Sequence, residues 1–232
     1  MKPIHLLPII LTLLVCLSNA SASQNKVSLN RCESQGHKIE ISVTTNQKGY
    51  RISQPYTSKT LNTKSRSSLA GDYVVGLTSL ESTTKIDVSG PVWQDKSKEG
   101  ECFAAQIKVQ LSYEPIQVYI GNEFLEGSCA YSAILEHELQ HVRLYQQNLP
   151  EMGKIVKDLM EKRFSGKPVY AERGSSKHLL EKEIDEFWRP LIKAEFAKFQ
   201  IQQAELDSEE NISKVTWSCL GEIQNKFGFR YN

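Results

Sequence analysis

Two histidines and a glutamate stand close together near the middle of the chain, in the run His137-Glu138-Leu139-Gln140-His141. In an α-helix, residues four apart lie on the same face, so both imidazoles can reach one metal ion. Zinc binds histidine nitrogens and, in hydrolytic sites, keeps one position open for a water whose pKa it lowers towards ~7. Glu138 can take a proton from that water and pass it to a leaving amine. The run therefore predicts one Zn²⁺ ion held by His137 and His141, with Glu138 as the catalytic general base.

The helix that must present these residues is indicated by the surrounding pattern. From Ala130 to Leu144, apolar residues and the two histidines recur at three- and four-residue spacing, which lines one helix face. The histidines continue the apolar stripe and are therefore expected to be buried, where a polar side chain needs a compensating interaction. A metal ion bound by both imidazoles would provide it. A pair of surface histidines on a solvated face is the alternative. Pro150 is expected to end this helix and to open another over about residues 151–164.

The rest of the sequence indicates an α+β protein, with a small N-terminal β-sheet followed by a helical half that contains the histidine pair. Alternating or β-branched segments predict strands at 38–43, 73–77, 106–111 and 117–120. The polar stretch 57–68 predicts an exposed loop. Further helices are expected from Ser176, with a kink or restart at Pro190, and over about 211–227. We expect one domain over residues 23–232, strand-rich over 23–121 and helical over 122–232.

Residues 1–22 predict a secretory signal peptide. Lys2 precedes an apolar run that ends at Leu17, and small residues follow at Ala20-Ser21-Ala22. The run is too short for a transmembrane helix, which needs ~20 apolar residues. We therefore expect cleavage after Ala22, a periplasmic or secreted protein, and no stable membrane insertion after cleavage.

Cysteine content supports export. The chain has five cysteines, and removal of the signal peptide with Cys16 would leave four. An even number in an exported chain argues for two disulfides. Three pairings exist. We favour Cys32–Cys102 together with Cys129–Cys219, because each disulfide would then staple one half of the chain.

The charge balance narrows the class of partner. The chain carries 28 Lys and Arg against 27 Asp and Glu, a formal net charge of +1. This argues against nucleic acid and anionic membranes as partners. A peptide or protein substrate fits the chemistry of the histidine motif better.

The segment Gly127 to His141 resembles the active-site helix of zincin metallopeptidases, and more narrowly a group of bacterial exported proteins with the H-E-x-x-H motif. The resemblance covers about 20–30 residues around the helix. It implies a zincin-like domain, zinc bound by His137 and His141, and Glu138 as general base for peptide hydrolysis.

The third zinc ligand is not given by the motif itself. The metzincin branch continues with a glycine and a third histidine, but Leu144 and Gln147 occupy those positions. In the gluzincin branch a later glutamate, often in E-x-x-x-D, completes the site, and Glu181 with Asp185 matches that spacing. Glu181 also lies at the edge of its helix's apolar stripe, where a carboxylate needs a cation. We favour Glu181 as the third ligand. The alternatives are His178, Glu172 and Glu183.

Two other functions fit the same sequence. One is a non-catalytic exported protein whose metal site serves binding or interaction. The other is a zinc amidase that acts on cell-wall peptides. Bound zinc without hydrolysis would indicate the first, and the substrate profile would identify the second.

Overall fold

Three stretches of chain form the β layer, and each contributes two strands in line. They are β1 (Glu40–Gln47) with β2 (Tyr50–Ser53), β3 (Gly76–Ser79) with β4 (Ser82–Ser89), and β7 (Gln106–Tyr113) with β8 (Ile116–Ile120). The structure, a computed structural model, describes residues 37–65, 74–94 and 100–227. The expected signal peptide and Cys32 lie outside the described residues.

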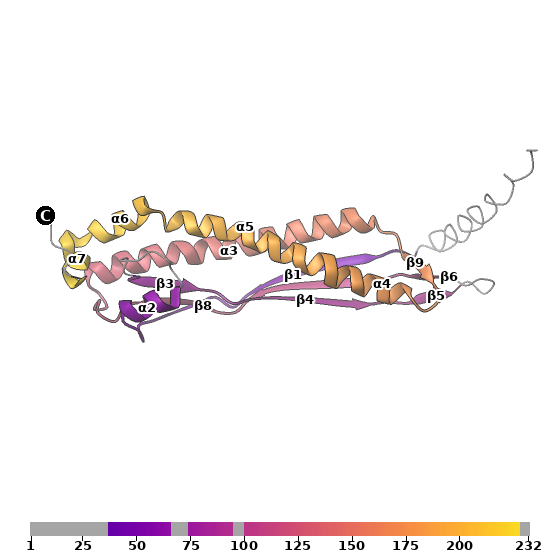
Figure 1. Cartoon of the computed structure of the whole chain (residues 1–232), viewed down its shortest axis with the longest axis horizontal. Coiled ribbons are helices and arrows are strands. Elements are labelled where there is room, and N and C mark those ends of the chain that lie inside the picture. Colours follow the sequence, from indigo (N-terminus) through magenta and orange to yellow (C-terminus); the bar gives the residue numbers. More distant parts are fainter. Residues whose placement is uncertain (1–36, 66–73, 95–99, 228–232) are drawn as a thin grey trace, which may run out of the picture.

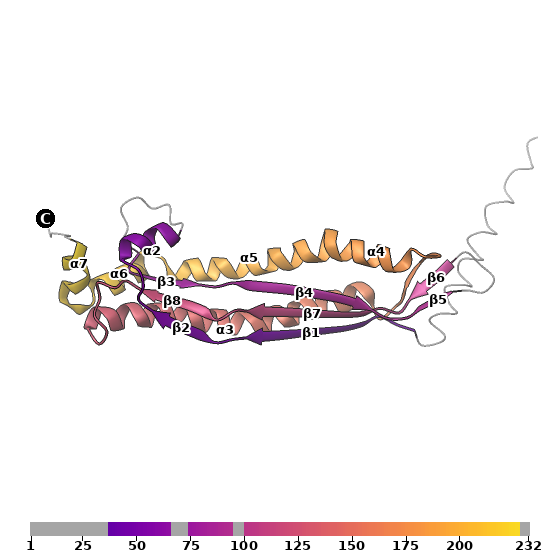
Figure 2. The same cartoon turned by 90° about the horizontal axis from the view of Figure 1, so that it is seen from below.

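These strands build two three-stranded sheets that follow one another end to end (Figure 2). β7 is central in the first, parallel to β1 and antiparallel to β4, and β8 is central in the second, between β2 and β3. Backbone hydrogen bonds from Glu114 to Glu81 and from Ile116 to Gly49 span the junction. A third small sheet consists of β5 (Val92–Gln94), β6 (Gly100–Phe103) and β9 (Val169–Glu172). It lies beyond the first sheet, at the end away from the second (Figure 2). The β layer is therefore a long, narrow ribbon.

The helical layer lies along this ribbon (Figure 1). One long helix, α3 (Cys129–Phe164), runs beside a second line of helices. That line consists of α4 (Ser176–Glu183), one π-helical turn (Ile184–Trp188) and α5 (Arg189–Leu206). The short helices α2 (Ser58–Ser65), α6 (Glu209–Trp217) and α7 (Glu222–Phe227) lie at the end where α3 begins. The expected α+β class is confirmed, and within the described residues no helix is long and apolar enough to cross a membrane.

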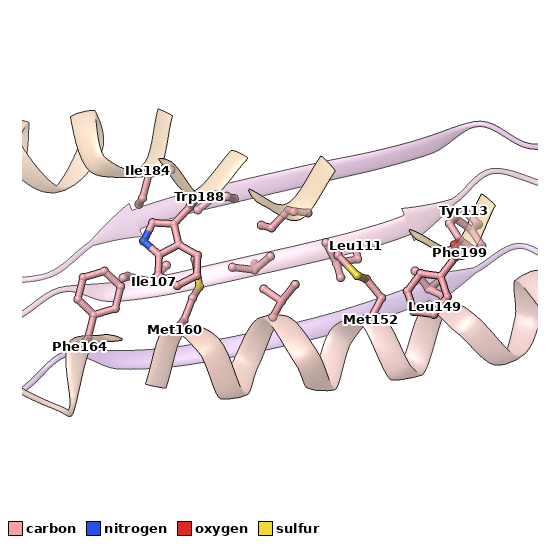
Figure 3. Packing of buried hydrophobic residues seen from close by; sticks show 14 of the residues in the cluster. Ile107, Leu111, Tyr113, Leu149, Met152, Met160, Phe164, Ile184, Trp188 and Phe199 are labelled. Atoms are coloured by element: carbon pink, nitrogen blue, oxygen red, sulfur yellow. The ribbon is translucent and has the colours of Figure 1, made fainter. Parts of the chain in front are cut away.

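The main hydrophobic core lies between the two lines of helices and the β layer (Figure 3). β7 supplies Ile107, Val109 and Leu111 on its inner face, while the residues between them are exposed, as the period-two pattern predicts. Across from them lie apolar side chains of α3 such as Met152, and Trp188 of the π-helical turn. This packing fixes how α3 and α5 face each other.

The expected helix end at Pro150 is wrong, because α3 continues through this residue to Phe164. A proline inside a helix cannot donate to the carbonyl four residues earlier, here that of Gln146. The side-chain amide of Gln47, at the end of β1, donates to this carbonyl at 2.8 Å. A neighbouring strand thus satisfies the oxygen that the proline leaves without a donor.

Two further expectations need correction. The stretch 57–68 is not all exposed loop, because α2 forms within it, with Leu61 buried and the carboxylate of Glu123 accepting from the Ser58 backbone. The helix expected over 211–227 is split into α6 and α7 by a 3₁₀ turn at Cys219–Gly221. Pro190 restarts its helix as expected, in the first turn of α5 after the π-helical turn.

The disulfide Cys129–Cys219 is present and joins the start of α3 to the turn between α6 and α7. Beside it, the carboxylate of Glu222 accepts a hydrogen bond from the Ala130 backbone at 3.1 Å. Cys102 is also disulfide-bonded, while Cys32, its expected partner, lies outside the described residues.

The close approach of α3 to β1 generates a stability prediction at Gly153. A methyl group there would lie 2.7 Å from Cγ2 of Thr45. Gly→Ala in a helix ordinarily stabilises by about 1 kcal/mol, whereas overpacking costs about 1–3 kcal/mol. We expect Gly153→Ala to lower the free energy of unfolding by about 1 kcal/mol, measured by urea denaturation. In a Thr45→Ala background the same change should raise it instead; equal effects in both backgrounds would contradict this account.

Candidate metal centre

The start of α3 fixes the direction of the histidine pair. Ser128 caps the helix by accepting from the backbone N–H of Tyr131 at 3.1 Å, and Cys129 anchors the first turn through its disulfide. From this start, His137 and His141 lie one turn apart on the face of α3 that meets the end of α5. The imidazole of His141 is buried, and that of His137 is 12% exposed.

Three side-chain atoms converge at this point. Nε2 of His137 and Nε2 of His141 lie 3.3 Å apart. Oδ1 of Asp207, the residue that follows α5, lies 3.2 Å from the first nitrogen and 3.0 Å from the second. Among the described residues, this is the one group of three or more His, Cys, Asp or Glu side chains close enough to share a metal ion.

The triangle has the size of a metal-binding site. Zinc binds histidine nitrogen and carboxylate oxygen at about 2.0–2.2 Å in tetrahedral geometry, so neighbouring ligand atoms lie about 3.3 Å apart. The three measured separations, 3.0, 3.2 and 3.3 Å, match that spacing within about 0.3 Å. Two nitrogens and one carboxylate oxygen also form a ligand set that zinc accepts. The residues present therefore fit a divalent metal and leave a fourth position for water.

Gln203 sets the tautomer of His141. Its amide nitrogen donates to the backbone carbonyl of His141 at 3.4 Å, which turns its carbonyl oxygen towards Nδ1 of the same residue, 2.7 Å away. Nδ1 must then carry the proton and donate it, because the amide oxygen can only accept. The lone pair of His141 is left on Nε2, the atom that faces His137 and Asp207.

The protonation equilibria of the group are strongly coupled. Burial by itself would raise the pKa of Asp207, but hydrogen bonds from the two imidazoles hold that pKa far below its usual range. Burial would lower the pKa of His141, yet the hydrogen bond and negative charge of Asp207 raise it. Because metal ligands must be deprotonated, a divalent cation bound to these atoms would take the place of the protons that they share.

Glu138 lies next to this group of three side chains and contacts the β layer. Its side chain is 5% exposed, and one carboxylate oxygen accepts from the hydroxyl of Thr78 in β3 at 2.7 Å. Burial raises the pKa of Glu138, and the Thr78 hydrogen bond only partly offsets this. Both imidazoles act on the same pKa through their charge, so the carboxylate lies within electrostatic reach of the histidine pair.

Glu181 is not brought to the histidine pair. It lies in α4, near the opposite end of the molecule from the start of α3, with an exposed carboxylate 3.6 Å from Lys177 (Figure 1). Asp185 pairs with Arg189 on the same helical line. The other sequence-based alternatives lie in β9 and α4 too: Glu172, His178 and Glu183.

Two polar residues of the site were not found from the sequence. Asp207 lies in the charged run 205–210, which favours a solvated junction between helices. One indication was available, because a carboxylate at the C-terminal end of a helix is unfavourable without a cation. The same residue also precedes the start of α6, where negative charge is favourable, so the indication is ambiguous. Gln203 carries no pattern of its own.

No protein-family model, curated protein or solved structure matches the chain. The case for a metal centre therefore depends on the geometry of the side chains.

The assignment of the third ligand predicts a contrast between two carboxylates. Asp207→Ala removes the oxygen from the triangle, and we expect zinc affinity to fall at least about 100-fold. Glu181→Ala should leave affinity unchanged, because that carboxylate faces solvent in α4. Competition against a fluorescent zinc chelator measures both. Loss of zinc in Glu181→Ala with retention in Asp207→Ala would reverse the assignment.

The role of Gln203 predicts a smaller effect. Gln203→Leu removes the acceptor for Nδ1 of His141 and frees the imidazole to change tautomer, which should weaken zinc binding about 10–100-fold. Gln203→Glu keeps an acceptor and should retain most of the affinity in the same titration. An equal loss in both variants would show that packing, rather than the acceptor, matters at this position.

Proposed function

We propose that this protein is an exported zinc-dependent hydrolase that cleaves peptide bonds with an activated water. The observation that carries the proposal is the convergence of the His137 and His141 nitrogens with one oxygen of Asp207, at separations suited to a tetrahedral metal. The resemblance of the α3 segment to zincin active-site helices agrees with it. A disulfide at the start of α3 is compatible with a location outside the cytoplasm.

Each side chain has a distinct part in this chemistry. A zinc ion, when bound, supplies a Lewis acid and lowers the pKa of a coordinated water. His137, His141 and Asp207 hold the metal, and Gln203 keeps the His141 lone pair directed at it. Glu138 accepts the proton of the attacking water and returns it to the leaving amine. Because burial raises the pKa of Glu138, its carboxylate is a stronger base than one in water.

One observation favours a second candidate function. Glu138 is almost fully buried and already hydrogen-bonded to Thr78. In a non-catalytic metal-binding protein, the same carboxylate would join α3 to β3 and the zinc would only hold α3 to α5. Stoichiometric zinc without hydrolysis of any peptide would indicate this function.

The proposed hydrolase predicts a selective loss of turnover in Glu138→Gln. Zinc-loaded wild-type protein should cleave members of a mixed library of unstructured peptides, stop when a chelator removes zinc, and resume when zinc is restored. Glu138→Gln should lower kcat/KM at least about 100-fold, because the proton acceptor is lost, while binding one zinc per chain.

The matched control is Glu161→Gln, which changes an exposed carboxylate on the same helix and should retain full activity. Mass spectrometry of the digested library gives both the rate and the cleaved bond, and it separates general peptidases from amidases specific for cell-wall peptides. Undiminished cleavage by folded, zinc-loaded Glu138→Gln would rule out the assigned mechanism.

A further inference from the structure

β3 contacts the Glu138 carboxylate through two residues on one face of the strand. Gly76 and Thr78 are two apart, so both face α3. β3 is an edge strand of its sheet and is held in register by β8, with Gly76 opposite Ile120 and Thr78 opposite Val118. The position of these two residues is therefore set by the sheet, independently of α5 and the metal ligands.

Thr78 holds one oxygen of the carboxylate. Its hydroxyl lies 2.7 Å from Oε2 of Glu138 and 3.2 Å from the backbone carbonyl of the same residue. A hydroxyl that contacts both the side chain and the backbone of Glu138 restricts the torsions between them. The side chain is thereby confined to a narrow range of positions.

Gly76 makes room for the other oxygen. A methyl group on its α-carbon would lie 2.5 Å from Oε1 of Glu138 and 2.7 Å from Cγ2 of Ile134. Both separations are shorter than van der Waals contact allows. Any residue larger than glycine would therefore have to displace the Glu138 carboxylate or the neighbouring Ile134 side chain.

We propose that Gly76 and Thr78 are positioning residues that together fix the orientation of the Glu138 carboxylate beside the metal centre. The inference rests on the proposed function, since it specifies how the general base is held. A base that moves by about 1 Å can lose about 100-fold in rate. The inner face of β3 is thus part of the hydrolytic site although neither residue binds the metal.

The experiment compares paired variants in zinc-loaded, full-length protein. Thr78→Val keeps the shape and removes the hydroxyl, and Thr78→Ser restores it. Gly76→Ala adds the methyl group that meets Oε1. Matched controls are Thr83→Val, an exposed threonine of β4, and Gly100→Ala, where the nearest atom to an added methyl group is a backbone oxygen 3.8 Å away.

Two readouts are taken, along with zinc content and thermal stability. The first is kcat and KM for a peptide that the wild type cleaves. The second is the dissociation constant of acetohydroxamic acid, which loses a proton when it chelates zinc, so that a well-placed carboxylate beside the metal strengthens its binding without any turnover. Glu138→Gln, which lacks the proton acceptor, defines the largest loss expected in kcat and in hydroxamate affinity.

We expect Thr78→Val to lower kcat about 10-fold and Gly76→Ala about 100-fold, with KM within about twofold and zinc content unchanged. Thr78→Ser should recover most of the rate, and the two controls should match the wild type. Hydroxamate affinity should fall in the same order.

Wild-type kcat and hydroxamate affinity in both Thr78→Val and Gly76→Ala would overturn the positioning role while leaving the proposed function in place. If zinc-loaded wild type cleaves no peptide, the proposed function fails, and hydroxamate affinity alone then decides. Weaker binding in the two variants would support the placement of Glu138 by β3, and unchanged binding would overturn it.

Discussion

One contact, between α3 and the end of α5, holds the candidate metal centre together. Gln203, near the end of α5, and Asp207, the residue that follows α5, both contact the ring of His141, the first at Nδ1 and the second at Nε2. Both nitrogens of the imidazole are thus held by one neighbouring segment. A shift of α5 by one residue would remove both partners at once. The core between α3, α5 and the β layer therefore determines whether the three ligand atoms meet.

The centre lies on α3 at the boundary between two hydrophobic clusters. Ala130, Tyr131 and Ile134 belong to a small cluster with Ile120 and Ile223, and residues from Val142 onward belong to the main core. Between them, α3 carries the buried side chains of Glu138 and His141, each with a hydrogen-bond partner from outside α3. Apolar packing on both sides of this turn holds α3 in place. The turn can therefore contain polar side chains whose burial without hydrogen-bond partners would cost free energy.

The sequence was sufficient for the parts of the protein that depend on local periodicity. The alternation in β7, the helical stripe of α3 and the spacing of the two histidines each follow from one segment, and the pairing of Cys129 with Cys219 followed from the division of the chain into halves. Parts that depend on contacts between distant segments could not be derived in this way. Asp207 is 66 residues from His141, and its charged neighbours are typical of a solvated turn.

The course of α3 through Pro150 has the same explanation. The residue that compensates the missing donor, Gln47, is 99 residues from the carbonyl it binds. Local rules predict a helix end at Pro150, whereas the contact with Gln47 allows α3 to continue through it. Likewise, Leu61 can anchor α2 only because the surrounding chain buries it.

The disulfide Cys129–Cys219 has a consequence for how the candidate metal centre assembles. His137 and Asp207 are 70 residues apart along the chain. The crosslink joins the two segments just outside them, so the path between the ligands through the sulfurs is only about 20 residues. Since the entropy cost of closing a loop grows with the logarithm of its length, this shortcut lowers the cost of bringing the ligands together by about 1 kcal/mol. In an oxidising compartment, an unfolded chain with this crosslink would therefore keep His137 and Asp207 at a higher effective concentration, which favours assembly of the three-residue group.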